Sequence, residues 1–487
     1  MIGKFVRDSI IYGFASLLSR GLSFLLVPYY SHSLVRSQFG MLDISTTFVI
    51  IATCLIAAEI SQGMARAYGD EKSPDERFSY LLSSLLYITL AYSAVGVLLY
   101  VFKEKCADLL LGDVSQINLV VCAYVCSFFT AVQVQISNHF RWSLQTKKAA
   151  IYTVVQTVSC LLFTILYVSF FQWGAVGAVL GVASGLVLLI MIELFDLRRI
   201  FCVKVSFAKI KQMLVFSLPL VPSGVGIFAT QFANRFVVKD LMNVGDVADL
   251  GVASRISAIV GLAMMGIGSA LMPLVTEHHQ EKETPQKIAQ IFSKVCGLSL
   301  IAVAILSIFR REFVLVFSTP EYAAASSLLG FFAASTILSQ LYPFSPGFWL
   351  KKKVGIMVMI NLSTAVLGVA LNYLLIPRLG LIAVGYSSLL SALVMVIVSM
   401  YFSNRLYPIP YGAKAILLGV VGVASFVCLD SFLMRIDLFH SLSFAIFAKV
   451  FSVCCVIASV MIAGILPSSE VIVFLSVVKK RVFASRA

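Results

Sequence analysis

Fourteen runs of about 18 or more mostly apolar residues divide this sequence, and each is long enough to cross a membrane as an α-helix. Of the 487 residues, 60% are hydrophobic and 12% are charged, whereas a soluble domain is about 45–50% apolar and about 25% charged. This composition excludes a soluble globular protein. The sequence therefore predicts an all-α integral membrane protein with about 14 transmembrane helices.

The predicted spans are bounded by charged residues, proline or glycine. In chain order they cover residues 9–30, 40–58, 80–102, 117–136, 150–171, 174–194, 214–234, 251–276, 292–317, 323–344, 354–375, 381–402, 413–433 and 443–466.

The charge balance predicts the orientation of these spans. The formal net charge is +14, which in a soluble protein would suggest nucleic acid as a partner. With fourteen spans, the side that carries both termini has more than twice as many Lys and Arg residues as the other side. Basic loops mark the cytoplasmic face, so we expect a multi-pass protein of the bacterial cytoplasmic (inner) membrane with both termini cytoplasmic and with no nucleic-acid partner. Membrane lipids are the expected partners of the basic runs.

An internal repeat predicts the domain organisation. The segment 142–148 (WSLQTKK) and the following 173–177 (WGAVG) are echoed by 349–353 (WLKKK) and 379–383 (LGLIA), at an offset of about 205 residues. An even number of spans separates the copies, which predicts two parallel six-helix bundles plus a C-terminal helix pair. The expected boundaries are 1–200 and 201–410 for the bundles, 411–466 for the pair and 467–487 for a basic cytoplasmic tail.

Glycines at regular positions add to this pattern. Gly40 and Gly251 each open the second span of their half, which makes them equivalent positions of the repeat. In the sixth span Gly177, Gly181 and Gly185 recur at a spacing of four residues. This spacing predicts close packing of the span against another helix.

A polar stripe runs along the first predicted span and includes Ser16, Arg20 and Ser23 on one helical face. A central arginine is costly in a membrane unless it faces a watery cavity or pairs with an acid. Because serines share its face, we interpret Arg20 as a cavity residue that binds substrate. The alternative is an ion pair with Asp43 or Glu59 that holds the bundle together.

Four more residues are candidates for substrate binding. Arg255 lies beside a stripe of small residues, and Asn361 and Asn372 share a face of the eleventh span. Arg66 follows the second span. For the arginines the structural alternative is snorkelling to the interface, and for the asparagines it is hydrogen bonding between helices. Snorkelling is also the alternative for three other charged residues near helix ends, which are Asp43, Glu193 and Arg235.

Other functional motifs are missing from the chain. It has no G-x-x-x-x-G-K-[ST] loop, so uphill transport would have to use an ion gradient, the membrane potential or the substrate's own concentration difference. The acids in the spans that could carry a proton are Asp43, Glu59 and Glu193 at most, and of these Asp43 and Glu59 are the candidates for ion coupling. The ten cysteines and five histidines have no metal-ligand spacing, and we expect no metal, no cofactor and no catalytic residue.

Several short motifs resemble the bacterial polysaccharide-biosynthesis flippases, which move undecaprenyl-pyrophosphate-linked oligosaccharides such as O-antigen units. The motifs are residues 16–28 (SLLSRGLSFLLVP), 39–40 (FG), 63–68 (GMARAY), 234–236 (NRF), 272–273 (MP), 371–380 (LNYLLIPRLG) and 407–410 (YPIP). This resemblance extends over nearly the whole chain. It implies the fold of the multidrug, oligosaccharidyl-lipid and polysaccharide exporter superfamily.

The resemblance implies a transporter that carries a lipid-linked oligosaccharide from the inner to the outer leaflet by alternating access, for synthesis of lipopolysaccharide or another surface polysaccharide. A polysaccharide polymerase and chain-length proteins are the further partners it suggests. Two alternatives stay open. One is a cation-coupled multidrug exporter of the same fold, and the other is a membrane glycosyltransferase or polymerase, which the short outer loops disfavour.

Overall fold

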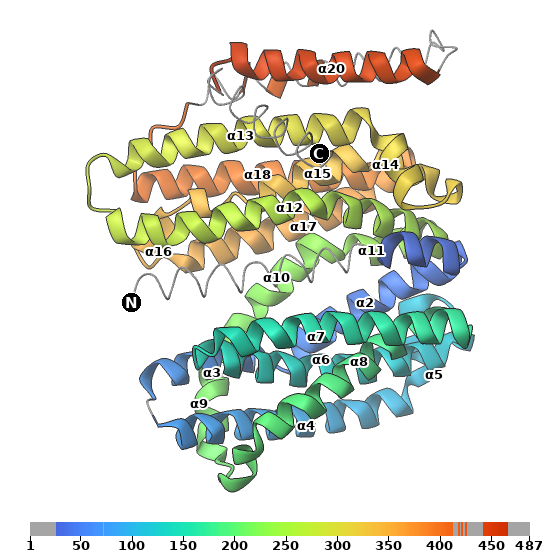
Figure 1. Cartoon of the computed structure of the whole chain (residues 1–487), viewed down its shortest axis with the longest axis vertical. Coiled ribbons are helices and arrows are strands. Elements are labelled where there is room, and N and C mark those ends of the chain that lie inside the picture. Colours follow the sequence, from blue (N-terminus) through green and yellow to red (C-terminus); the bar gives the residue numbers. More distant parts are fainter. Residues whose placement is uncertain are drawn as a thin grey trace, which may run out of the picture. The chain divides into compact units, whose positions relative to one another are not determined.

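The computed structural model describes residues 26–71, 73–412, 417–418, 420–421, 424–425 and 442–465. Within these residues the regular structure is helical throughout, with no strand (Figure 1). In this described part of the chain, ten helices are long and apolar enough to cross a membrane, and a pair bent by 52° makes an eleventh if it forms one span. The prediction of an all-α membrane protein is therefore confirmed.

The helices of the first half of the chain run from α2 to α11. They are α2 (Arg36–Ile56), α3 (Ile60–Asp70), α4 (Pro74–Val101), α5 (Lys103–Leu111), α6 (Ile117–Trp142), α7 (Thr146–Ile165), α8 (Gly174–Asp196), α9 (Phe207–Ser217), α10 (Val221–Phe232) and α11 (Asn234–Leu241). The second half contributes α12 (Val244–His278), α13 (Thr284–Ile308), α14 (Arg310–Phe317), the bent pair η5 (Pro320–Ser327) and α15 (Leu329–Ser339), α16 (Gly347–Leu350), α17 (Val354–Leu379), α18 (Ile382–Leu406) and α20 (Leu442–Ile462).

The second to twelfth predicted spans each match one of these membrane-crossing elements, with ends that shift by up to nine residues. The bent pair corresponds to the predicted span 323–344. Most of the predicted spans 9–30 and 413–433 lies outside the described residues, and in α20 the apolar stretch Ala448–Ile462 is shorter than a full span.

The two copies of the internal repeat contain the same kind of helix-ending turn. After α6 the N–H of Gln145 donates to the carbonyl of Phe140 at 2.9 Å, and after α16 the N–H of Lys353 donates to the carbonyl of Phe348 at 2.7 Å. Such six-residue hydrogen bonds close a helix C-terminus. Gly174 opens α8, and Gly380 lies two residues before the start of α18. Both glycines have positive φ angles, of 56° and 65°. The predicted boundaries between halves, at residues 200 and 410, stay a prediction.

The contacts divide the chain into two compact units. One comprises Met1–Arg255, Val316–Ala324 and Asn361–Ser387, and the other comprises Ile256–Leu315, Ala325–Ile360 and Ser388–Ala487. The first unit packs α7 closely on α8 because glycines face the neighbouring backbone: a Cβ at Gly181 would lie 2.4 Å from the Cα of Thr164. The close packing predicted from the glycine spacing is therefore confirmed.

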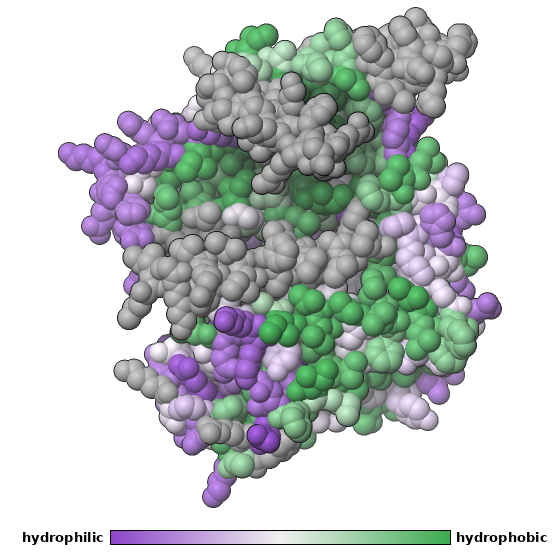
Figure 2. Space-filling model, in the orientation of Figure 1, coloured by the Kyte–Doolittle hydropathy of each residue, from purple (hydrophilic) through white to green (hydrophobic). Residues whose placement is uncertain are grey.

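Side chains on the outside of α7 and α8 are apolar although they are exposed. Figure 2 shows hydrophobic side chains gathered over α7, and among the exposed ones are Ile151 and Leu162 of α7 and Met191 and Phe195 of α8. In a soluble protein such a surface would be unstable, whereas in a membrane it faces lipid. In the second unit, α20 packs on α13 through Val456, Val460 and Ile308.

Candidate functional site

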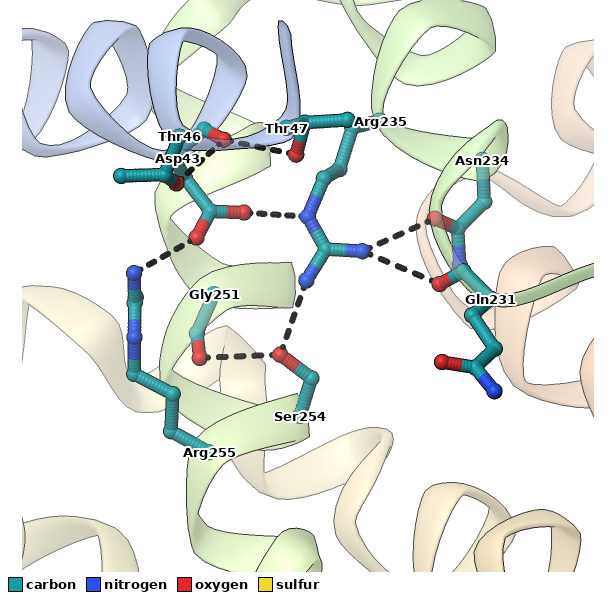
Figure 3. A network of polar contacts seen from close by, with 9 residues as sticks. All are labelled: Asp43, Thr46, Thr47, Gln231, Asn234, Arg235, Gly251, Ser254 and Arg255. Atoms are coloured by element: carbon teal, nitrogen blue, oxygen red, sulfur yellow. Dashed lines mark hydrogen bonds and ion pairs between the residues drawn. The ribbon is translucent and has the colours of Figure 1, made fainter. Parts of the chain in front are cut away.

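Asp43 lies at the centre of a network of charged side chains in the first unit (Figure 3). It projects from α2 and is only 2% exposed. The Nε of Arg235, on α11, donates to its Oδ2 at 2.5 Å, and Nη2 of Arg255, on α12, lies 2.8 Å from its Oδ1. One carboxylate therefore bridges two guanidinium groups from helices far away in the sequence. On the predicted topology, this network lies toward the outer face.

The remaining donors of Arg235 are satisfied by its surroundings. Nη2 donates to the hydroxyl of Ser254 at 3.1 Å, and Nη1 donates to the carbonyl of Gln231 at 3.2 Å and to Oδ1 of Asn234 at 3.3 Å (Figure 3). Its guanidinium lies 5.0 Å from the centre of the Phe232 ring. This arginine is a buried structural group, so snorkelling to the interface is not its role.

Two glycines allow α2 and α12 to approach each other. A Cβ on Gly251 would lie 3.1 Å from the carboxyl carbon of Asp43 and 2.9 Å from Nη1 of Arg255. On the other helix, a Cβ on Gly40 would lie 1.9 Å from the carbonyl oxygen of Val244. The sequence places both glycines at equivalent positions of the repeat. Their common role in the structure is close packing around the ion pairs.

Arg255 differs from Arg235 because part of its hydrogen-bonding capacity is unused. Its side chain is 26% exposed, and its Nη1 is buried without a hydrogen-bond partner in the described part of the chain. Its guanidinium lies 5.1 Å from the centre of the Phe39 ring. With one acid and two arginines, the network has a formal charge of +1. Such a group can accept an anion through charge-assisted hydrogen bonds.

A second ion cluster connects the starts of the same two helices. Nη2 of Arg36 lies 2.9 Å from Oδ1 of Asp246 and also contacts Asp249, which is fully buried. Asp246 also accepts a hydrogen bond from Asn243 at 2.6 Å. This cluster was not predicted from the sequence. The only sequence signal for this cluster is that Asp246 and Asp249 lie about one helical turn apart, just before the eighth predicted span.

Glu59 lies on the wall of a cavity of about 370 Å³ in the first unit. Its backbone has a left-handed φ of 50° at the break between α2 and α3, and its carboxylate accepts a contact from Sγ of Cys54 at 3.6 Å. Polar side chains of α2, α6 and α10 also line the cavity, and apolar residues form most of the remaining wall. Besides Glu59, the polar and aromatic lining residues are Thr53, Ser61, Gln135, Gln231, Phe228 and Phe232.

The other predicted site residues are dispersed. Arg66 is exposed on α3, where its guanidinium stacks 4.8 Å from the ring centre of Phe216. On α17, Asn361 is partly exposed, and Asn372 is 4% exposed with its Oδ1 lacking a hydrogen-bond partner among the described residues. Neither Arg66 nor Arg255 lines the cavity that contains Glu59.

Ser16, Arg20 and Ser23 lie outside the described residues. Their assignment to substrate binding therefore stays a prediction. No group of three or more His, Cys, Asp or Glu side chains that could hold a metal ion occurs in the described ranges.

Comparison with known proteins gives two family matches along the chain. The model of a family described as "Polysaccharide biosynthesis protein" matches residues 5–279, and the MatE family model matches residues 219–374. An uncharacterised membrane protein of Methanocaldococcus jannaschii is 20% identical over 448 residues, which is 84% of this chain and 86% of that protein.

The fold is similar to two solved transporter structures. The lipid II flippase MurJ in an inward closed conformation has a TM-score of 0.69 at 15% identity, with 95% of this chain and 100% of that chain covered. An inward-facing multidrug resistance MATE family transporter of the MOP superfamily has a TM-score of 0.63 at 15% identity, with 82% and 94% covered. The exporter-superfamily fold expected from the sequence is confirmed.

Proposed function

Because the chain belongs to the polysaccharide biosynthesis protein family, we propose that it is a flippase for an undecaprenyl-pyrophosphate-linked oligosaccharide, such as an O-antigen unit. It carries this unit from the inner to the outer leaflet of the bacterial cytoplasmic membrane, with both of its own termini in the cytoplasm. The sugars and pyrophosphate cannot cross hydrocarbon unaided, whereas the polyprenyl tail can stay in lipid. A protein path for the polar part is therefore sufficient.

The observation that carries this proposal is the excess positive charge of the Asp43 network. Arg255 is the group in this network with an unused donor, Nη1, and with partial exposure. A planar guanidinium binds a pyrophosphate through two parallel hydrogen bonds. When the substrate anion binds the guanidinium of Arg255, it competes with the carboxylate of Asp43 for this group. Substrate binding would thereby weaken one of the two ion pairs by which Asp43 holds α2 to α11 and α12.

This competition supplies a mechanism for alternating access. The predicted six-helix halves meet where α2, from the first half, is bound to α11 and α12, from the second half, through Asp43 and Arg36. In the proposed mechanism these pairs hold α2 to α11 and α12 on the predicted outer side. Release of Arg255 to the pyrophosphate lowers the cost of separating α2 from α12, which opens the path to the outer leaflet.

One observation favours a second candidate, a cation-coupled multidrug exporter of the same fold. The cavity of about 370 Å³ contains the carboxylate of Glu59 beside the aromatic rings of Phe228 and Phe232, a combination that suits an organic cation. We favour the flippase because the family match covers more than half of the chain and concerns polysaccharide synthesis. A polysaccharide polymerase and chain-length proteins would then act on its product, so we do not assign catalysis to this chain.

Deletion of the gene in its host tests the proposal. A flippase deletion abolishes the surface polysaccharide and accumulates finished lipid-linked units on the inner leaflet, accessible only from the cytoplasm. A deletion that leaves unpolymerised units at the outer leaflet contradicts the proposal and supports a polymerase. Normal polysaccharide together with increased sensitivity to cationic drugs supports the exporter.

A further inference from the structure

Glu193 is a fully buried acid that the proposed mechanism does not use. It lies on α8, near the predicted cytoplasmic end, and has 0% exposure. Its Oε1 accepts a hydrogen bond of 3.1 Å from Nε2 of Gln133 on α6, which is 4% exposed. The carboxylate therefore does not snorkel to the interface, although the sequence suggested this alternative. The carboxylate group of Glu193 lies inside the first compact unit, in contact with α6.

Two oxygen atoms of this pair have no partner. Oε2 of Glu193 and Oε1 of Gln133 are both buried and accept no hydrogen bond in the described part of the chain. Among the side chains that the structure describes, no Lys, Arg or His forms an ion pair with Glu193 within 4.0 Å. An ionised carboxylate in such surroundings is costly, and an unsatisfied amide oxygen adds to this cost.

A single proton accounts for both unsatisfied oxygens. A protonated carboxyl has one O–H donor, and a side-chain amide has one C=O acceptor beside its N–H donor. If Oε2 of Glu193 carries the proton, it can donate to Oε1 of Gln133 while the amide N–H donates to Oε1 of Glu193. Both oxygens then have a partner, and the buried group is neutral.

We propose that Glu193, paired with Gln133, is a proton-binding site that is loaded in this conformation and exchanges its proton with the cytoplasm during the transport cycle. The coupling part of this inference rests on the proposed flippase function. On loading, hydronium transfers one proton to the carboxylate of Glu193 and becomes water. The reverse reaction releases the proton. This site is additional to Asp43 and Glu59.

The surrounding helices provide a polar connection to the helix end. On α7, Tyr152 donates to Oδ2 of Asp196 at 3.1 Å, and Asp196 forms an ion pair of 2.6 Å with Lys148. Asp196 is exposed at the last residue of α8, three residues beyond Glu193, so the polar groups of Lys148, Tyr152 and Asp196 lie at the helix end next to the buried acid.

Three other ionisable groups on elements packed against α8 have partners of their own. On α6, His139 is hydrogen-bonded at Nδ1 to the hydroxyl of Tyr68 at 2.6 Å. On α2, Asp43 is neutralised by its arginines, and in η2 (Leu166–Phe170) the hydroxyl of Tyr167 contacts Ser184 at 3.2 Å. These groups do not supply a countercharge to Glu193, which favours the neutral acid. A metal cation would need more oxygen ligands than the three that this pair presents.

Infrared difference spectroscopy of the purified full-length protein tests for the bound proton without any substrate. We expect a band of a protonated carboxylic acid at neutral pH in the wild type, its loss in Glu193→Gln and its shift in Gln133→Leu. Glu104→Gln, an exposed acid on α5 of the same bundle, is the matched control and leaves the band unchanged. Absence of the band from the wild type, or a band that requires sodium, overturns the proposal.

Surface polysaccharide in the host tests whether the proton is exchanged. Glu193→Gln mimics the neutral acid and retains the hydrogen bonds, so we expect the protein to insert at normal level but to lose polysaccharide export. If Glu193→Gln exports normally, the proton is only structural and the coupling is overturned. If deletion of the whole gene leaves the polysaccharide intact, the flippase function fails instead, and the infrared result still decides whether the site holds a proton.

Discussion

Asp43 and Arg235 are 192 residues apart in the sequence, and an ion pair of 2.5 Å joins them inside the first compact unit. Both side chains are almost fully buried, at 3% and 7% exposure. A charge in this position is tolerated only because its partner is present, since removal of one member of a buried pair leaves the other unpaired. The pair therefore makes α2 and α11 depend on each other.

Substitution of Asp43 by Asn should strongly destabilise the protein, because it leaves the guanidiniums of Arg235 and Arg255 without an acid. We expect a loss of about 3–5 kcal/mol, seen as a lower melting temperature in detergent and lower abundance in the membrane. The double variant Asp43→Leu with Arg235→Met should recover a part of this loss. Asp108→Asn, an exposed acid, is the control and should melt like the wild type. An unchanged melting temperature for Asp43→Asn would show that the pair contributes nothing.

Gly40 should not tolerate a side chain. A Cβ at this position would lie 1.9 Å from the carbonyl oxygen of Val244, so Gly40→Ala must push α2 away from α12. We expect a loss of about 1–3 kcal/mol in thermal unfolding. Gly69→Ala is the matched control, because a Cβ there would meet no heavy atom within 4 Å and alanine favours the helix. Equal melting temperatures for the two variants would contradict the close approach of the helices.

Arg255 should be needed more for transport than for stability. In Arg255→Ala the acid Asp43 keeps Arg235 as its partner, so we expect a smaller loss of stability than for Asp43→Asn but a loss of surface polysaccharide. Arg255→Lys should restore transport only in part, because an ammonium lacks the bidentate fork. Membrane abundance and polysaccharide are measured together. Normal polysaccharide from Arg255→Ala would exclude this residue as the anion site.

The spans could be predicted from the sequence because each contains its own signal, a run of apolar residues long enough to cross the bilayer. The charge pairs could not. Arg235 lies just after a predicted span, where snorkelling is the ordinary expectation, and its burial depends on α11 continuing the helix as far as Leu241. Only the tertiary structure brings Asp43 to it. The repeat identifies Gly40 and Gly251 by their spacing, but spacing alone does not reveal the close helix crossing that requires them.

The break after α2 also could not be predicted, because the sequence contains no local helix-breaking signal for it. The predicted span ends at residue 58, and no proline or glycine lies between residues 41 and 59. In the structure α2 ends at Ile56, and both Ala58 and Glu59 adopt the left-handed region, at a φ of 50°. Local preference disfavours this conformation for residues other than glycine, so packing of the surrounding helices determines it.

The fourteen-span topology can be tested independently of any substrate. Reporter fusions at Lys352 and at the C-terminus should give a cytoplasmic signal, because basic loops stay on that side. Fusions near Asp108 and Asp437 should give an outer signal. Lys352 and Asp437 are separated by three predicted spans, so a signal on the same side for both would mean that the predicted number of crossings in this part of the chain is wrong.

Arg20 is predicted to bind the pyrophosphate of the substrate, and its alternative role is an ion pair with Asp43 or Glu59. Since Asp43 already contacts two arginines, Glu59 is the more informative partner to test. If Arg20 binds substrate, Arg20→Ala should abolish polysaccharide export at normal membrane abundance, and Arg20→Lys should rescue it only partly. If Arg20 is structural, Arg20→Ala should lower abundance, and the added change Glu59→Gln should restore both abundance and export, because it removes the unpaired acid. Normal export from Arg20→Ala alone would refute the substrate role.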